Sequence, residues 1–269
     1  MDIITHTRTC LAKIKKTSPL IHNITNFVVM NSSANILLAL GASPVMAHAK
    51  EEVNDMAALA GALVLNIGTL QEDWVDAMIR AGKAANEKKI PVILDPVGAG
   101  ATSFRTLSVK RIMDECKVSV LRGNASEILS LVDSSVKTKG VDSSIGLTDN
   151  MVETFSHLAS QNKMVVAVSG EVDCITDGTQ VFRVKNGHPL MTRVTGIGCG
   201  LSAVVGAFCA VMPEDLACTT AAALGFYGLC GEVAARINDK PGSFYTAFVD
   251  CLYTVGPGDI QNCLRVYND

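Results

Sequence analysis

Hydrophobic residues along the chain form short continuous runs that alternate with longer amphipathic segments. The runs are rich in β-branched residues, and they lie at Ala62–Ile67, Pro91–Leu94, Val118–Leu121 and Met164–Val168. The segments between them are long enough to form helices. This alternation is typical of βαβ units, in which helices join buried parallel strands. The pattern therefore predicts a parallel sheet.

The segments between and after these runs predict helices and one hairpin. Glu72–Lys89 begins with acidic residues and ends with lysines, which complements a helix dipole at both ends. Asp173–Asp177 and Thr179–Lys185 flank Gly178 and predict an antiparallel hairpin added to the sheet. Apolar stretches that would form helices on one face follow at Leu201–Val211, Asp215–Ile237 and Ser243–Val255. The expected fold is α/β, a three-layer αβα sandwich with a mostly parallel central sheet.

Size and charge narrow the class of protein. A chain of 269 residues with 48% hydrophobic side chains can bury one large core. We therefore expect a single domain over residues 1–269. The net charge of -3, with both signs spread along the chain, does not indicate binding to nucleic acid or to an anionic membrane. The expected ligand is a small molecule.

The positive mean hydropathy of +0.30 raises the question of a membrane protein. Apolar stretches such as Leu201–Met212 and Thr220–Cys230 are too short and too rich in Gly and Ala to cross a bilayer. No secretory signal is visible at the start of the sequence. Nine cysteines show neither a Cys-x-x-Cys pair nor zinc-ligand spacing, and most of them are expected to be buried thiols in a reducing compartment. The sequence therefore predicts a cytoplasmic location.

A glycine-rich turn, Val194–Gly200, leads directly into an apolar helix. Glycines allow the backbone N–H groups to face one point, and the helix start adds positive potential, so the turn could bind an anion. A plain turn is the alternative, because Gly-x-Gly alone is weak evidence. Cys199 follows the second glycine of the motif, in the first helical turn, where a thiol pKa is expected to be lowered. It could accept a proton from a substrate hydroxyl.

Polar residues stand at the ends of three further expected strands. Asp95 could organise Mg2+ through water, although a helix cap or an Asx-turn is the alternative. Arg122 offers a planar fork for phosphate oxygens, and Glu127 could complete the metal site, although Asn124 and Glu127 also match a capping box. Ser169 is the weakest candidate, because a strand-terminal Ser-Gly is usually a turn. Together these ends predict one phosphate-binding edge.

These four stretches resemble the ribokinase-like superfamily, whose Gly-x-Gly-Asp motif places a catalytic base at the start of the anion-hole helix. The sequence departs from that motif at Cys199, as hydroxyethylthiazole kinases also do. The N-terminal half narrows the match, since Ile21–Asn31, Ala34-Asn35 and Leu40–Met46 are similar to the opening of that kinase family in residues and spacing. The resemblance covers nearly the whole chain.

The resemblance implies transfer of the ATP γ-phosphate to the hydroxyl of 5-(2-hydroxyethyl)-4-methylthiazole in thiamine salvage. It also implies a homotrimer with active sites near subunit boundaries. Cys199 would be the catalytic residue. The thiazole site would include Asn26, Met46, Gly196 and Cys199, ATP would be held by Arg122, Asn124, Ser169 and Gly198, and Mg2+ would lie by Asp95 and Glu127.

From the residues alone, some of these positions have simpler explanations. Met46 would by default be a core residue, Asn26 a helix cap, and His22 a loop histidine with no assigned role. Three other functions stay open. They are hydroxymethylpyrimidine kinase, NAD(P)H-hydrate dehydratase of the same fold, and a silent ligand-binding protein built on a kinase fold.

Overall fold

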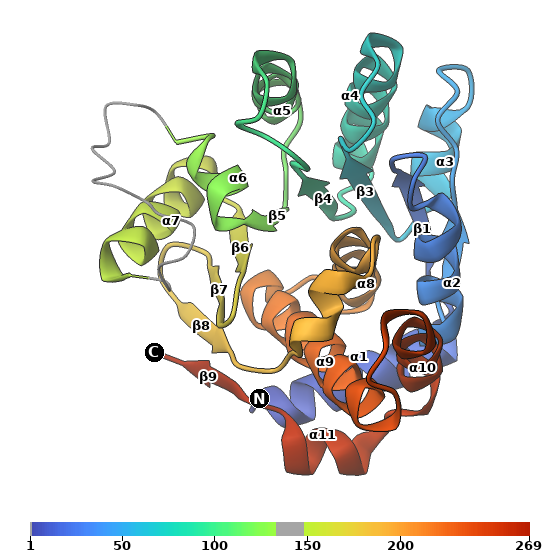
Figure 1. Cartoon of the computed structure of the whole chain (residues 1–269). Coiled ribbons are helices and arrows are strands. Elements are labelled where there is room, and N and C mark those ends of the chain that lie inside the picture. The colour runs from blue at the N-terminus through green and yellow to red at the C-terminus, as the bar shows by residue number, and fades with distance from the viewer. Residues whose placement is uncertain (1, 133–147) are drawn as a thin grey trace.

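The computed structural model describes residues 2–132 and 148–269, which form a layered α/β molecule around one large sheet (Figure 1). Its nine strands follow the order β2-β1-β3-β4-β5-β6-β7-β8-β9. The first five neighbouring pairs, from β2 to β6, are parallel, and the last three are antiparallel. The strands are β1 (Leu20–Ile24), β2 (Ser43–Val45), β3 (Ala62–Asn66), β4 (Val92–Asp95), β5 (Val120–Asn124), β6 (Val165–Ser169), β7 (Asp173–Thr176), β8 (Val181–Val184) and β9 (Val266–Asn268).

Helices cover both faces of the sheet, and each face has its own hydrophobic core. One core lies under α1 (Ile3–Thr17), α2 (Met30–Leu40), α8 (Ile197–Val211), α9 (Leu216–Ile237), α10 (Pro241–Thr254) and α11 (Pro257–Cys263). The other lies under α3 (Val53–Leu59), α4 (Glu72–Glu87), α5 (Ser103–Glu115), α6 (Ala125–Leu129) and α7 (Asp149–Asn162). A short 3-10 helix, Pro189–Arg193, precedes α8. The predicted three-layer αβα sandwich is confirmed.

The apolar runs form the centre of the sheet because both of its faces are covered. All residues of β3 and β4 are buried, which is why these strands show no alternation of polar and apolar positions. The predicted hairpin is also confirmed, as β7 and β8 pair in antiparallel register. Strand β5 ends later than the predicted apolar run, which stopped at Leu121. It continues to Asn124 because the polar residues Arg122, Gly123 and Asn124 still pair with β6.

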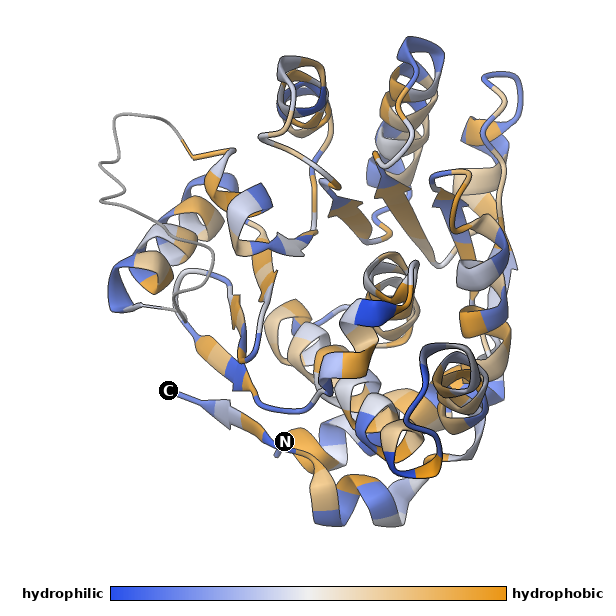
Figure 2. Ribbon diagram, in the orientation of Figure 1, coloured by the Kyte–Doolittle hydropathy of each residue, from blue (hydrophilic) through white to orange (hydrophobic). Residues whose placement is uncertain are grey.

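The longest apolar helix, α9, belongs to the interior of the molecule. Among the described residues it is the one helix that is long and apolar enough to cross a membrane, but 89% of its most apolar window is buried inside the molecule. Residues 217–232 of α9 are all buried, so the rest of the molecule covers this helix on every side. Figure 2 shows hydrophobic residues along it, mixed with more polar ones.

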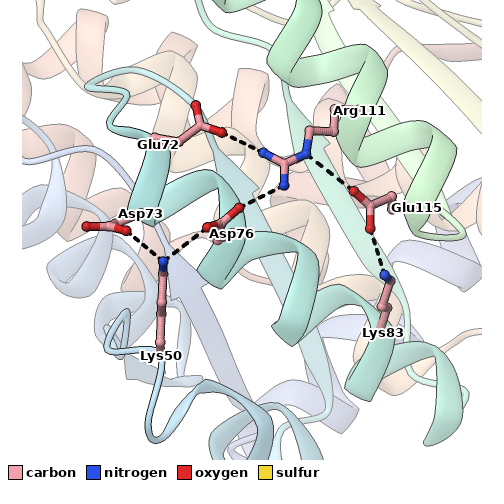
Figure 3. A network of polar contacts seen from close by, with 7 residues as sticks. All are labelled: Lys50, Glu72, Asp73, Asp76, Lys83, Arg111 and Glu115. Atoms are coloured by element: carbon pink, nitrogen blue, oxygen red, sulfur yellow. Dashed lines mark hydrogen bonds and ion pairs between the residues drawn. The ribbon is translucent and has the colours of Figure 1, made fainter.

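Ion pairs on the surface join α4 to α5 and to the loop before α3 (Figure 3). Arg111 contacts Glu72 at 2.7 Å and Asp76 at 2.8 Å, while Lys50 contacts Asp76 at 3.0 Å from the opposite side. Further pairs join Lys50 to Asp73, Lys83 to Glu115 and Arg111 to Glu115. The acidic start of α4 therefore serves contacts between elements as well as the helix dipole.

Candidate functional site

Five parallel strands deliver polar residues to one edge of the sheet. Asn66 ends β3, Asp95 ends β4, Asn124 ends β5 and Ser169 ends β6, while Asn26 lies two residues beyond β1. Ligands of open α/β sheets bind outside this carboxyl edge. The start of α8 lies against the same edge, because Asn26 and Arg122 both contact its first turn.

Gly196 makes the start of α8 possible. It caps the helix with φ at +87°, in the left-handed region that favours glycine, and an added Cβ would lie 2.8 Å from Ser32 Oγ. As the N-cap residue, Gly196 has no side chain that could bond the first-turn N–H groups, which leaves them available to an anion. Tyr227 donates to the Ile197 carbonyl at 2.7 Å and fixes the turn from the core side.

Arg122 connects this turn to the ends of β4 and β6. Its guanidinium donates to the Gly198 carbonyl at 2.9 Å and to Ser169 Oγ, and it lies 3.9 Å from Asp95 Oδ2. Its Nε is buried and has no hydrogen-bond partner within the described ranges. A buried guanidinium with unused donor capacity fits an anionic ligand such as a phosphate.

Asp95 is buried beneath this group, with 1% of its surface exposed. Its Oδ2 accepts hydrogen bonds from Ser202 Oγ at 2.7 Å and from Asn66 Nδ2 at 2.9 Å. Burial raises the pKa of Asp95 to about 6, although Arg122 and these donors act in the opposite direction. Asp95 therefore keeps its proton to higher pH than an exposed aspartate does, and it is mostly ionised at neutral pH.

Cys199 is half-buried in the first turn of α8 and meets the end of β1. Its Sγ accepts a hydrogen bond from Asn26 Nδ2 at 3.6 Å, and Asn26 in turn donates to Asn66 Oδ1 at 2.8 Å. The expected lowering of the thiol pKa is wrong. Burial, assisted by the negative charge of Asp95, raises the pKa of Cys199 and outweighs the hydrogen bonds from Asn66 and Asn26.

Glu127 lies in α6, the short helix that directly follows β5. The predicted capping box is present, because Asn124 accepts from the Glu127 backbone N–H and Glu127 Oε2 accepts from that of Asn124, both at 2.9 Å. Glu127 Oε1 also accepts from Gly98 N at 2.8 Å. Both oxygens of this carboxylate already face backbone donors, so the capping explanation holds whether or not the residue has a second role.

The two carboxylates fit Mg2+ when water lies between them and the ion. Asp95 and Glu127 are close enough for the charge of Glu127 to contribute to the raised pKa of Asp95. Within the described ranges no three or more His, Cys, Asp or Glu residues cluster as a metal cage would require. Mg2+ keeps several water ligands in proteins, so a pair of carboxylates that already have protein donors suits it.

A cavity of about 650 Å³ opens beside Arg122 and Ser169. Its lining includes Ile197 and Gly198 of α8, and also Asp173, Asn186 and His188. Burial raises the pKa of Asp173 to about 7. The cavity is large enough for a nucleotide, and its mostly apolar lining carries a few polar groups, among them Arg122.

Sequence reasoning missed three residues that hold the site together. Asn66 and Ser202 bind Asp95, and Arg105 donates to the carbonyls of Ile67, Gly68 and Val97 in the loops after β3 and β4. Asn66 could have been found, since it is the polar end of an apolar run. Ser202 and Arg105 lie within helices and gave no comparable signal.

The structure brings most of the predicted site residues together. Asn26, Asp95, Arg122, Ser169 and Cys199 are joined by the contacts described above, and Gly196 and Gly198 belong to the same turn. Met46 directly follows the edge strand β2 and is half-buried. Asn124 is exposed and its side chain serves the cap. The ligand roles of all these residues stay predictions.

Comparison with known families and proteins gives a consistent result. The model of the hydroxyethylthiazole kinase family matches residues 11–257. The hydroxyethylthiazole kinase of Desulfotalea psychrophila is 55% identical over 256 residues, covering 95% of this chain and 93% of that protein.

Comparison with solved structures gives the same family. The hydroxyethylthiazole kinase of Pyrococcus horikoshii superposes with a TM-score of 0.90 at 42% identity, over 98% of this chain and 99% of that one. A ribokinase-like superfamily protein of Enterococcus faecalis, 13% identical, superposes with a TM-score of 0.63 over 88% and 87% of the two chains, which shows a shared fold.

Proposed function

The chain belongs to the hydroxyethylthiazole kinase family, and on that premise we propose that it transfers the γ-phosphate of ATP to the hydroxyl of 5-(2-hydroxyethyl)-4-methylthiazole. The products would be 4-methyl-5-(2-phosphooxyethyl)thiazole and ADP. The observation that carries this proposal is one polar network of hydrogen bonds and an ion pair. It joins Cys199 of α8, Asn26, Asn66, Asp95 and Arg122, which come from five separate parts of the chain.

The nucleotide would occupy the cavity beside Arg122 and Ser169. Arg122 would bind the polyphosphate, exchanging its bond to the Gly198 carbonyl for phosphate oxygens. The N–H groups in the first turn of α8 would stabilise the transferred group, since the N-cap residue Gly196 has no side chain that could bond them. Phosphoryl transfer depends chiefly on alignment and on charge neutralisation, and these groups provide both.

The acceptor alcohol would lie against Asn26, Met46, Gly196 and Cys199, with its hydroxyl toward the thiol. Because the pKa of Cys199 is raised, the side chain enters the reaction as a neutral thiol. It therefore orients the hydroxyl first. When the bond to phosphorus has largely formed, the sulfur would take the hydroxyl proton while its own S–H proton passes to a phosphate oxygen. Asn26 holds the sulfur in place through its 3.6 Å contact.

Mg2+ would be held by Asp95 and Glu127 through water and would supply charge neutralisation at the phosphates. Asp95 is oriented by Asn66 and Ser202, and Glu127 by the backbone of Gly98 and Asn124. Asn124 would stand at the entrance of the nucleotide site, where it is exposed.

The assembly and location of the protein follow from the same family. A homotrimer is supported by Phe27 and Val28, which directly follow Asn26 and are 55% and 65% exposed. Exposed apolar residues beside a substrate site suit a subunit boundary. Sedimentation of the purified protein tests the trimer. A cytoplasmic location suits the free cysteines of the described chain.

The test of the activity compares three conditions. Mg2+-dependent ADP release is measured with the thiazole alcohol, with hydroxymethylpyrimidine and with no acceptor. With the thiazole alcohol, we expect one molecule of ADP to be released for each molecule of stable thiazole phosphate ester that forms. Faster release with the pyrimidine would favour the pyrimidine kinase, and restoration of NAD(P)H from its hydrate would favour the dehydratase. Binding of both ligands without ADP release would contradict any kinase function.

A further inference from the structure

Asn66 stands between the two halves of the site. It is 1% exposed at the end of β3, with β1 on one side and β4 on the other. Its Oδ1 accepts from Asn26 Nδ2 at 2.8 Å, on the side of Cys199. Its Nδ2 donates to Asp95 Oδ2 at 2.9 Å, on the side of the phosphates. The Asn66 amide is thus bonded directly to Asp95 and, through Asn26, is connected to Cys199.

Two backbone N–H groups give this chain of amides a fixed direction. Gly68 N donates to Asn66 Oδ1 at 3.0 Å, and Val28 N donates to Asn26 Oδ1 at 3.1 Å. A backbone N–H can only donate, so each amide must turn its oxygen toward it. The amide nitrogens therefore face Asp95 in one case, and Asn66 and Cys199 in the other. Neither amide can flip without placing two donors against each other.

Close packing preserves this arrangement. A Cβ on Gly68 would lie 2.5 Å from Asn26 Nδ2, so the loop after β3 can approach Asn26 only because residue 68 is glycine. Ser202 adds a second donor to Asp95 from α8 at 2.7 Å. The orientation of the Asp95 carboxylate is thus set by donors from β3 and from the helix that carries Cys199.

We propose that Asn66 is a positioning residue that fixes the Cys199 side and the Asp95 side of the site relative to each other. This inference rests on the proposed phosphoryl transfer. It assigns Asn66 no contact with substrate. Its effect is to keep the hydroxyl-facing thiol and the phosphate-facing carboxylate in one geometry, through hydrogen bonds that have a single allowed direction.

Two substitutions separate the two contacts. Asn66→Asp keeps an oxygen for Gly68 and Asn26, but it places a second oxygen, in place of the donor, against Asp95. We expect affinity for the thiazole alcohol, measured by calorimetry without nucleotide, to stay within about twofold of the native value. We expect kcat to fall at least about tenfold, because Asp95 loses a donor and faces a like charge.

Asn66→Ala removes both contacts, so affinity for the thiazole alcohol should fall about tenfold together with kcat. Asn23→Ala is the matched control. Asn23 is equally buried on the neighbouring strand β1 but donates to the Ile21 carbonyl at 2.9 Å, outside the chain of amides. It should retain near-native alcohol affinity and kcat. Thermal unfolding of all variants reports the general cost of losing a buried amide.

Several results would overturn the inference. Folded Asn66 variants that behave like Asn23→Ala would remove the positioning role. Unchanged alcohol affinity in Asn66→Ala would show that the two sides are not coupled. If Asn66→Ala does not fold, Asn66→Asp carries the test, because it has nearly the same shape and volume. A native protein that neither binds nor phosphorylates the alcohol would instead refute the proposed function, before any variant is compared.

Discussion

Cys199 replaces the acidic residue that the superfamily resemblance places at the start of the anion-hole helix. Sequence reasoning expected its helix position to lower the thiol pKa, whereas burial and the neighbouring Asp95 raise it. Helix position can be read from glycine spacing, but burial depends on residues that are distant in the sequence. The thiol therefore suits late proton transfer better than early deprotonation.

Substitution of Cys199 tests this role. We expect Cys199→Ala to lose part of kcat while keeping affinity for both substrates, because the side chain contributes mainly in the transition state. Cys199→Asp should remain active, since it restores the acidic residue of the wider superfamily. Steady-state kinetics with the thiazole alcohol give both values. Equal kcat for Cys199→Ala and the native protein would remove the proton-accepting role.

The reactivity of the same thiol toward iodoacetamide should follow its raised pKa. Alkylation of Cys199 should keep accelerating from about pH 8 to about pH 10, because the thiolate is the reactive form. Mass spectrometry of digested protein reads out Cys199 beside the half-buried Cys263 as an internal reference. A rate that levels off near neutral pH would show that the thiol is readily ionised after all.

Near neutral pH, the buried and ionised carboxylate of Asp95 should lower the free energy of unfolding. Its pKa is raised from 3.8 to about 6, so the folded chain binds this proton more tightly than the unfolded chain does. Stability therefore falls as pH rises from about 4 to about 6. We expect Asp95→Asn to be more stable than the native protein at about pH 8, by roughly 1 to 3 kcal/mol, and nearly inactive.

The advantage of Asp95→Asn should shrink toward about pH 4, where the native carboxyl is protonated. Thermal unfolding across this range measures it. A variant that is less stable than the native protein at every pH would mean that the Arg122 and Asn66 contacts outweigh the cost of burying the charge.

At the scale of elements, the buried strands whose residues are all apolar were predictable, and the buried strand β1, which contains polar residues, was not. The apolar runs of β3 and β4 predicted buried strands. In contrast, β1 carries His22 and Asn23 in its buried centre and was not predicted as a strand. His22 is accommodated there by a 2.7 Å hydrogen bond to the Ala47 carbonyl. Such partners lie far away in the sequence, so composition alone does not reveal them.

The ion pairs between α4 and α5 should contribute little to the stability of the folded protein. Arg111 is 42% exposed at its side chain, and water screens its bonds to Glu72, Asp76 and Glu115. We expect Arg111→Met to lower Tm slightly at low salt and not at about 1 M salt. Arg8→Met, which removes a 3.4 Å hydrogen bond to Gln261, is the matched control. A large loss of Tm that persists at high salt would show that Arg111 stabilises the helix pair by packing.

At the scale of the whole molecule, the fold and the edge of the sheet that carries the site were predictable, and the contacts that complete the site were not. Strand ends identified Asp95, Arg122 and Ser169, while Ser202 entered from within α8 and Arg105 from within α5. A residue inside a helix is assigned to a site only when the packing angle of that helix is known. That angle depends on the whole core.

The two hydrophobic cores share one sheet, so we propose that the chain unfolds as a single unit. Strands β1 and β3 to β7 contribute buried residues to the cores on both faces, and neither core can separate without breaking the sheet. Differential scanning calorimetry should show one cooperative transition. Two resolved transitions would contradict the expected single domain.

The central claim is that Asp95, Arg122 and the glycine-cysteine turn surround one nucleotide polyphosphate. A crystal structure with Mg2+, a non-hydrolysable ATP analogue and the thiazole alcohol tests it most directly. We predict phosphates between Arg122 and the start of α8, with the acceptor hydroxyl facing Cys199. A nucleotide bound elsewhere, or an alcohol that lies away from Cys199 and the terminal phosphate, would contradict the account.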